Sequence, residues 1–326
     1  MKRVCVIPLC AAALYGQQLS VKSATARRVE LAWTGTAAAW TVERKTGAGP
    51  FEKVGEVSVP PFVDDKIASY ATYHYRIRSQ GGAPSNEVTL GPPPSGVTVP
   101  ARAPKGSDPG KYGTNSALAL DENDDPALAF LWIDPNGDND DADNTVYFVR
   151  WNRAAYSWKG PVKIAVVGEI PSQNLEPVSL ACDGATGAFA LAYPTTGTQG
   201  AHVALSRDGG TTWQAKAVEG NMEGSAYSTA LAVINGRWIM AIATDQTGIR
   251  YLTGEISAAP SEWKSQTAPV PAATKVQAGG SVALTPDLTG KPLVAYWVTP
   301  AIHASGSSAI LELSPCEVCA GSCWWQ

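Results

Sequence analysis

The chain has 326 residues, of which 44% are hydrophobic and 17% are charged, which is enough apolar material for two packed domains and excludes a largely disordered chain. Its formal net charge is −4, so it lacks the basic surface that nucleic acid or anionic lipid requires, and we expect neither as a partner. The 31 glycines and 24 prolines separate short apolar runs. This pattern predicts many turns and short strands, and therefore an all-β fold.

Residues 1–16 have the pattern of an export signal peptide. Two basic residues precede an apolar run over residues 4–13, and small residues offer cleavage points near Gly16. The run is too short to cross a bilayer as a helix, and no later run is long enough, so we expect no membrane span. A buried first strand is the alternative, and a lipid anchor at Cys10 is disfavoured because Leu9 is too bulky for that cleavage. The mature protein is predicted to be secreted, periplasmic or displayed at the cell surface.

Residues 17–91 alternate apolar and polar residues in short runs separated by Gly- and Pro-containing turns, which predicts a small antiparallel sandwich. The segment resembles a fibronectin type III domain. Residues 29–33 match the family's strand B, residues 40–45 its strand C, residues 73–78 its strand F and residues 85–90 its strand G. The resemblance implies a spacer or protein-interaction module rather than a catalyst.

In that family a tyrosine near the start of strand F ties its hydroxyl to backbone upstream, and here Tyr73 has this position. The sequence contains no Arg-Gly-Asp motif, so the resemblance does not extend to integrin binding. Residues 92–106, PPPSGVTVPARAPKG, then predict an extended, proline-stiffened linker and a domain boundary.

Residues 107–315 contain four related segments, each with a strand, a turn and a second apolar strand. They begin at Ser116, Val178, Ser228 and Ser281. A unit of about 50 residues with several short strands predicts a β-propeller blade, whose apolar faces are buried by neighbouring blades. We therefore expect a propeller of about four blades, with a second sandwich as the alternative. Closure by residues near 107–114 and a chain shortened relative to its ancestors both remain open.

The stretch SRDGGTTW resembles the Asp-box, S-x-D-x-G-x-T-W, of sialidase-type propellers. The matching residues are Ser206, Asp208, Gly210, Thr212 and Trp213. The stretch falls where the repeat predicts the turn between the third and fourth strands of a blade. A carboxylate there can accept hydrogen bonds from turn N–H groups, and glycines permit positive φ. Trp213 is expected to pack on the neighbouring blade. In the family this turn lies away from the catalytic face, so we expect a structural role.

The sialidase resemblance also implies a catalytic set: three arginines on a sugar carboxylate, a tyrosine nucleophile with a glutamate partner, and an aspartate acid/base. The family's Arg-Ile-Pro segment is absent, because residues 169–171 are Glu-Ile-Pro and reverse the charge. Five arginines follow the linker, and none lies on a predicted inner strand. The predicted turns contain Arg153, Arg207 and Arg237, and the predicted third strands contain Arg150 and Arg250. Tyr193 and Tyr296 end second strands, where core aromatics are the expected interpretation. We therefore assign no catalytic residues.

An acidic insertion follows the second predicted strand of the first of these four repeats. Its oxygen-bearing residues at near-alternate spacing are Asp134, Asn136, Asp138, Asp140 and Asp143. Such spacing is typical of calcium loops, since hard cations take six to eight oxygen ligands. The match to the EF-hand loop is imperfect, because Gly137 comes one place early and Thr145 stands where glutamate is usual. A calcium site and a solvated acidic hairpin both remain open, and calcium is the only cofactor that the sequence suggests.

Residues 316–326 form a cysteine-rich tail with Cys316, Cys319 and Cys323. Three thiolates at this spacing resemble part of a zinc site, but no fourth ligand follows, and Ala320 excludes the haem attachment pattern. In an oxidising compartment a disulfide within the tail is the better prediction.

Taken together, these patterns predict an exported binding or display protein with a glycan or an extracellular protein as its partner. A glycoside hydrolase of the sialidase superfamily is the alternative, and purely structural adhesion is a third possibility.

Overall fold

The structure is a computed structural model of the chain. It describes residues 17–95, 111–133, 144–167, 178–194, 201–217, 226–244, 248–267, 274–276, 282–300 and 310–315. These residues form strands and one short 3₁₀ turn, Pro260–Glu262, so the chain is all-β as predicted. No helix among them is long and apolar enough to span a membrane. The chain divides into two compact units, residues 1–95 with 152–157 and residues 96–151 with 158–326.

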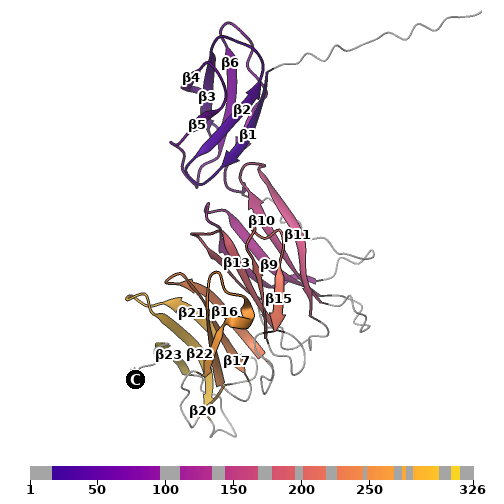
Figure 1. The fold of residues 1–326 in the computed structure, drawn as a ribbon, viewed down its shortest axis with the longest axis vertical. Helices are drawn as coiled ribbons and strands as arrows, with labels where there is room; N and C mark the ends of the chain where they lie inside the picture. The colour runs from indigo at the N-terminus through magenta and orange to yellow at the C-terminus, as the bar shows by residue number, and fades with distance from the viewer. Residues whose placement is uncertain are drawn as a thin grey trace, which may run out of the picture. The chain divides into compact units, whose positions relative to one another are not determined.

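The first unit is a sandwich of two antiparallel sheets (Figure 1). One sheet has the order β1-β2-β5 and the other β4-β3-β6-β7. The strands are β1 (Gln18–Ala24), β2 (Val29–Thr34), β3 (Trp40–Thr46), β4 (Glu52–Val57), β5 (Phe62–Asp64), β6 (Tyr73–Ser79) and β7 (Val88–Leu90). Alternate residues of β2, β3 and β6 point inward, and Trp33 and Trp40 meet edge to face in the core at a centroid distance of 6.0 Å.

Tyr73 ties the loop before β6 to the sandwich, as the sequence predicted. The backbone N–H of Ala68 donates to the Tyr73 hydroxyl at 2.9 Å. The last predicted strand is shorter than expected, because regular pairing with β6 starts only at Val88. Residues before it are held by side chains instead, since the Ser85 hydroxyl accepts a hydrogen bond from the N–H of Ile77.

The second unit contains four successive antiparallel sheets (Figure 1). Sheet 1 is β8 (Lys111–Leu120), β9 (Pro126–Ile133), β10 (Thr145–Asn152) and β11 (Ser157–Val166). Sheet 2 is β12 (Ser179–Asp183), β13 (Ala188–Pro194), β14 (Ala201–Ser206) and β15 (Gln214–Ala217). Sheet 3 is β16 (Ala226–Ile234), β17 (Arg237–Thr244), β18 (Gly248–Glu255) and β19 (Lys264–Thr267). Sheet 4 is β20 (Thr274–Val276), β21 (Val282–Pro286), β22 (Pro292–Pro300) and β23 (Ile310–Pro315).

Sheets 1 to 3 are meanders in which each strand pairs with the next, the arrangement expected of a propeller blade. Sheet 4 differs, because β20 and β21 pair with successive parts of the same side of β22. Together they occupy the place of one first strand, with β22 and β23 beside it. The first strands β8, β12, β16 and β21 contact one another in this order, but the sheets do not close into a ring.

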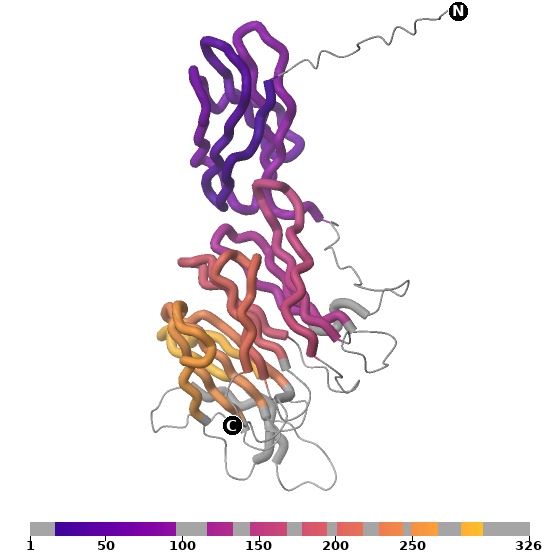
Figure 2. The backbone as a smooth tube through the Cα atoms, turned by 45° about the vertical axis from the view of Figure 1, so that its right-hand side comes forward, coloured from indigo at the N-terminus to yellow at the C-terminus, as the bar shows by residue number. Residues whose placement is uncertain are grey.

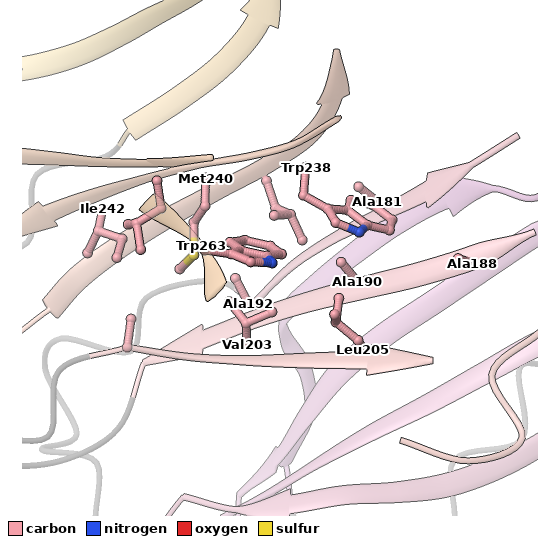
Figure 3. Close-up of a cluster of buried hydrophobic side chains, with 13 residues drawn as sticks. Ala181, Ala188, Ala190, Ala192, Val203, Leu205, Trp238, Met240, Ile242 and Trp263 are labelled. Carbon is pink, nitrogen blue, oxygen red and sulfur yellow. The ribbon is translucent and has the colours of Figure 1, made fainter. Parts of the chain in front are cut away.

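The sheets pack face to face through buried apolar side chains. Figure 3 shows the layer between sheets 2 and 3, where alanines of β13 meet larger residues of β17. Trp238, Met240 and Ile242 fill the space that Ala190 and Ala192 leave, and all five are fully buried. At roughly 25 cal/mol per Å² of apolar surface removed from water, such layers are the main source of the unit's stability.

The strand order separates two edges of the second unit. One edge, here called the turn edge, has every connection between first and second strands and between third and fourth strands, and all of these belong to the described residues. The opposite ends of these strands form the loop edge, from which the chain continues into residues outside the described ranges. Figure 2 shows the backbone of the chain from a second side.

Candidate functional site

The turn between β14 and β15 is organised around the carboxylate of Asp208. Its Oδ1 accepts hydrogen bonds from the Ser206 hydroxyl at 2.8 Å and from the N–H of Thr211 at 3.0 Å. Its Oδ2 accepts from the Thr212 hydroxyl at 2.6 Å, and the N–H of Thr212 reaches both oxygens. The turn joins the third and fourth strands of sheet 2, which is the predicted position. The carboxylate therefore serves the backbone of its own turn.

The second half of this turn packs on sheet 1. Gly209 and Gly210 adopt φ of +67° and +85°, and the N–H of Gly210 donates to the Ser206 hydroxyl at 2.8 Å. The indole N–H of Trp213 donates to the carbonyl of Gly210 at 3.0 Å, and its ring meets Phe148 edge to face at 5.0 Å. Because Phe148 lies on β10, the turn joins two sheets, and the expected packing of Trp213 on the neighbouring blade is confirmed.

Asp208 makes the stability of this turn dependent on pH. Hydrogen bonds from Thr212, then from Ser206 and Thr211, lower the pKa of Asp208 from 3.8 to about 2. When folding lowers the pKa of a carboxyl group, the folded state gains stability at pH values above the pKa of the unfolded state. This gain is lost as the pH falls through the pKa of the folded state. We expect Asp208→Asn to cost about 1 kcal/mol at pH 7, after allowance for solvent screening at this exposed site.

The cost of Asp208→Asn should disappear between pH 4 and pH 2, because the parent carboxylate is protonated over that interval. Urea denaturation of parent and variant at pH 7, 4 and 2 measures the difference in free energy of unfolding. A difference that stays constant down to pH 2 would show that the charge of Asp208 does not stabilise the turn.

Side chains at the turn edge tie each sheet to the next. Arg150 of sheet 1 donates to the carbonyl of Gly209 in sheet 2 at 3.1 Å. Arg207 of sheet 2 donates to the carbonyls of residues 257 and 258 in sheet 3 at 2.7 and 3.0 Å. Asn235 of sheet 3 donates to the carbonyl of Gly290 in sheet 4 at 2.8 Å. Each tie runs from a side chain to the backbone of the following sheet.

Arg150 is also the cation of a small acidic cluster. Its guanidinium lies 3.0 Å from Asp121 and 3.3 Å from Glu122. Burial raises the pKa of Asp121, against the opposing effect of backbone hydrogen bonds and of Arg150. Burial, with the charges of Glu122 and Asp121, raises the pKa of the half-buried Cys182 thiol to about 12, so this cysteine is a poor nucleophile at neutral pH. The cluster is therefore suited to joining sheets rather than to chemistry.

The five arginines of the repeats can now be placed against the carboxylate clamp that the sialidase resemblance implies. Arg150 and Arg250 lie on the third strands β10 and β18, and Arg153 and Arg207 lie in turns, as predicted. Arg237 differs from its predicted turn position, because it begins β17 and lies 3.0 Å from Glu255. The described first strands β8, β12, β16, β20 and β21 contain no arginine.

Two aromatic rings lie at the loop edge of sheet 2. Tyr193 and His202 face each other across β13 and β14, stacked at 5.5 Å with an interplanar angle of 18°. Tyr193 is 2% exposed, and burial raises its pKa to about 12. Burial lowers the pKa of His202. A buried, protonated phenol in the apolar layer fits the predicted core role rather than a nucleophile.

Several predicted site residues lie outside the described residues. They are Asp134, Asn136, Asp138, Asp140, Asp143, Cys316, Cys319 and Cys323. In the sequence, the acidic insertion follows β9 and precedes β10. Within the described part of the chain, no group of three or more His, Cys, Asp or Glu residues is arranged to hold a metal ion.

The sequence interpretation missed the aspartates that organise the first turn of three sheets. Asp121 Oδ1 accepts from the N–H groups of residues 123 and 125 at 2.7 and 2.9 Å. Asp287 Oδ1 accepts from those of residues 289 and 291 at 2.7 and 2.8 Å. Asp183 Oδ2 accepts from Thr186 at 3.1 Å. An acidic residue at the end of each first strand was the available signal, because short polar side chains commonly close such turns.

No protein-family model matches the chain, and no curated protein matches it in sequence. Solved structures resemble it at low identity. The Hadza microbial sialidase Hz136 is 10% identical, with 93% of this chain and 85% of that chain covered and a TM-score of 0.42. The xylan beta-1,4-xylosidase from Bacillus halodurans C-125 is 12% identical, with 91% and 53% covered and a TM-score of 0.40.

The Trypanosoma rangeli sialidase is 10% identical, with 87% of this chain and 43% of that chain covered and a TM-score of 0.39. This chain therefore spans about half the length of the last two proteins. At such identities and TM-scores the likenesses have no bearing on the activity of this chain.

Proposed function

We propose that the protein is an exported, modular carbohydrate-binding protein whose glycan ligand docks at the loop edge of the second unit. The observation that supports this most is the use of polar side chains at the opposite edge. Asp208, Arg150, Arg207 and Asn235 are bonded to their own turn or to the next sheet. The turn edge is thus structural, which leaves the loop edge, the end at which propeller-like proteins place variable segments.

The modules of this proposal are those that the sequence suggests. Residues 1–16 act as a signal peptide and direct the protein out of the cytoplasm, and residues 92–106 act as a linker. Residues 17–91 form a fibronectin type III domain, supported by the sheet orders β1-β2-β5 and β4-β3-β6-β7 and by the Tyr73 hydrogen bond. The turn at residues 206–213 is an Asp-box, supported by the hydrogen bonds to Asp208.

Calcium is proposed to bind the acidic insertion, residues 134–143, and to organise the loop edge for the glycan. The insertion concentrates carboxylates that would otherwise repel one another, and calcium prefers oxygen ligands of this kind. The following experiment separates hydrolysis of the bound glycan from simple glycan binding. Recognition of a protein at the same edge is the alternative if no glycan binds.

A glycan array with the secreted protein, followed by calorimetry with and without EDTA, tests the proposal. We expect saturable binding of one glycan class in calcium, weakened at least about tenfold by Asp138→Ala, since losing one ligand of a calcium site weakens it strongly. Asp65→Ala removes an exposed carboxylate of the first unit and should leave binding unchanged.

Binding that withstands both EDTA and Asp138→Ala would contradict the calcium part alone. A protein that binds no glycan would contradict the proposed function. Turnover of a fluorogenic sialoside would contradict the assignment of binding without catalysis and would favour the glycoside hydrolase.

A further inference from the structure

The stacked rings of Tyr193 and His202 lie at the loop-edge end of the layer between sheets 1 and 2. Tyr193 is the last residue but one of β13, and His202 is the second residue of β14. The two residues pair directly across these strands, so their side chains lie on the same face of sheet 2. Tyr193 packs in one apolar cluster with Val146 and Val167, which belong to sheet 1 and to the end of its last strand. His202 therefore faces sheet 1 as well.

The imidazole of His202 has an aromatic neighbour but no hydrogen-bond partner among the residues that the structure describes. Its ring stacks on the phenol of Tyr193 at 5.5 Å. Its Nδ1 is buried and makes no hydrogen bond there. A neutral imidazole has one nitrogen without a proton, so Nδ1 can remain an unprotonated acceptor inside the layer. Protonation would place a charged N–H donor at the same buried position, where the described residues offer it no acceptor.

Sheet 2 brings no charge to His202 among its described side chains. The titratable group that faces the imidazole from β13 is the phenol of Tyr193, which burial keeps protonated and neutral by raising its pKa to about 12. On the other side, His202 pairs with Ala217 of β15. The neighbouring Lys216 pairs with Val203 instead, and its side chain therefore lies on the opposite face of the sheet.

Sheet 1 brings no charge to this position either, as far as its side chains are described. Val146 and Val167 are apolar. The two lysines of β11, Lys159 and Lys163, are exposed. The acidic cluster around Arg150 lies at the turn edge, the other end of the layer. In agreement with this arrangement, burial is the one cause that lowers the pKa of His202, and no charge contributes to the shift.

The burial of a neutral imidazole links the packing of this layer to pH. The ordinary pKa of histidine is 6.5, and burial lowers that of His202 in the folded chain. An imidazole exposed to water by unfolding or local opening therefore takes up a proton at a higher pH than the packed one. The packed state is favoured above pH 6.5, and this advantage is lost as the pH falls below that value.

We propose that His202 is an acid-sensitive contact that holds the loop-edge ends of sheets 1 and 2 together. While neutral, its ring packs on Tyr193 and closes the layer. When protonated, the ring leaves the layer, and the adjoining ends of β13 and β14 open. The turn edge stays closed, because Asp208 remains ionised until the pH approaches its pKa of about 2 and Arg150 keeps its charge. The contact does not depend on the identity of any ligand.

Amide hydrogen exchange of the full chain at pH 7.5 and pH 5.0, corrected for the intrinsic effect of pH on exchange, tests this proposal. We expect local opening of residues 188–194 and 201–206 to increase at least about threefold at pH 5.0 in the parent. His202→Phe retains a ring that stacks on Tyr193 but takes up no proton, so its opening should be the same at both pH values. His202→Gln is a second neutral variant of smaller bulk, with the same expected result.

His74→Gln is the matched control, because it removes a histidine of the first unit and should leave the response of β13 and β14 to acid unchanged. An increase in opening that persists in both neutral variants of His202 would overturn the proposal, and so would a parent whose opening is the same at the two pH values. Titration of the parent's imidazole resonances by NMR needs no variant. A pKa of 6.5 or higher for His202 would likewise contradict the proposal.

Discussion

Gly210→Ala is expected to lower the free energy of unfolding of the second unit by about 3 kcal/mol or more, because two costs add. The residue has φ of +85°, a region that costs a non-glycine residue roughly 1 to 2 kcal/mol. An added Cβ would also lie 2.1 Å from Cε1 of Phe148. Phe148 is 2% exposed and is held by Phe189 and Trp213, so its ring has no room to move, and overpacking costs typically about 1 to 3 kcal/mol.

Gly236→Ala is the matched control for this change. Gly236 has φ of +69°, but a Cβ there would meet no atom within 4 Å. The control therefore shows the backbone cost alone, roughly 1 to 2 kcal/mol. Differential scanning calorimetry of the parent and both variants measures the shift of the transition that belongs to the second unit. Equal shifts for the two variants would show that contact with Phe148 has no part in the effect.

Asp64→Ala should destabilise the first unit by about 3 to 5 kcal/mol, the range found when one partner of a buried ion pair is removed. The carboxylate is 5% exposed and lies 2.7 Å from Nη1 of Arg44. It also accepts from the Tyr75 hydroxyl and from the N–H of Lys66, each at 2.9 Å. Burial, then the charge of Asp64, raises the pKa of Tyr75, so this phenol stays protonated and needs an acceptor.

Two further variants separate the causes of this loss. Tyr75→Phe removes one hydrogen bond and should cost about 1 to 1.5 kcal/mol. Asp65→Ala removes the adjacent, exposed carboxylate and should change stability by no more than about 0.5 kcal/mol. Urea denaturation followed by amide hydrogen exchange in the strands of the first unit measures the loss for all three variants. If Asp64→Ala cost no more than Tyr75→Phe, the ion pair with Arg44 would contribute nothing beyond a single hydrogen bond.

Local patterns in the sequence predict local structure well in this chain. Alternation of apolar residues located β2, β3 and β6 within one residue of their observed ends. The internal repeat placed the turn at Ser206–Trp213 between third and fourth strands, and the spacing of its polar residues predicted that Asp208 would serve the turn. These features depend on neighbours in the chain, which a single sequence contains in full.

Features that depend on distant partners were not predictable in the same way. Sheet 3 has serine and proline where sheet 2 has its aspartate turn. It forms a 3₁₀ turn at Pro260–Glu262, in which Glu262 accepts from the N–H of Ala259. The alternation of small and large apolar residues along the strands is visible in the sequence. Which sheet's alanines pack on which sheet's larger residues emerges only from the contact of Ala190 with Met240. The segments that would take part in the proposed glycan binding were not predictable either, because local patterns constrain long connections least.

The sheets of the second unit pack in one direction, with the alanines of each sheet on the larger residues of the next. This direction makes the repeats interchangeable in evolution. Each sheet presents alanines toward its successor and large residues toward its predecessor, as Ala230 and Leu231 do on β16. A duplicated sheet inserted after its original would meet a compatible surface on both sides. Gene duplication can therefore lengthen such a chain, and deletion can shorten it, by whole units without the invention of a new interface.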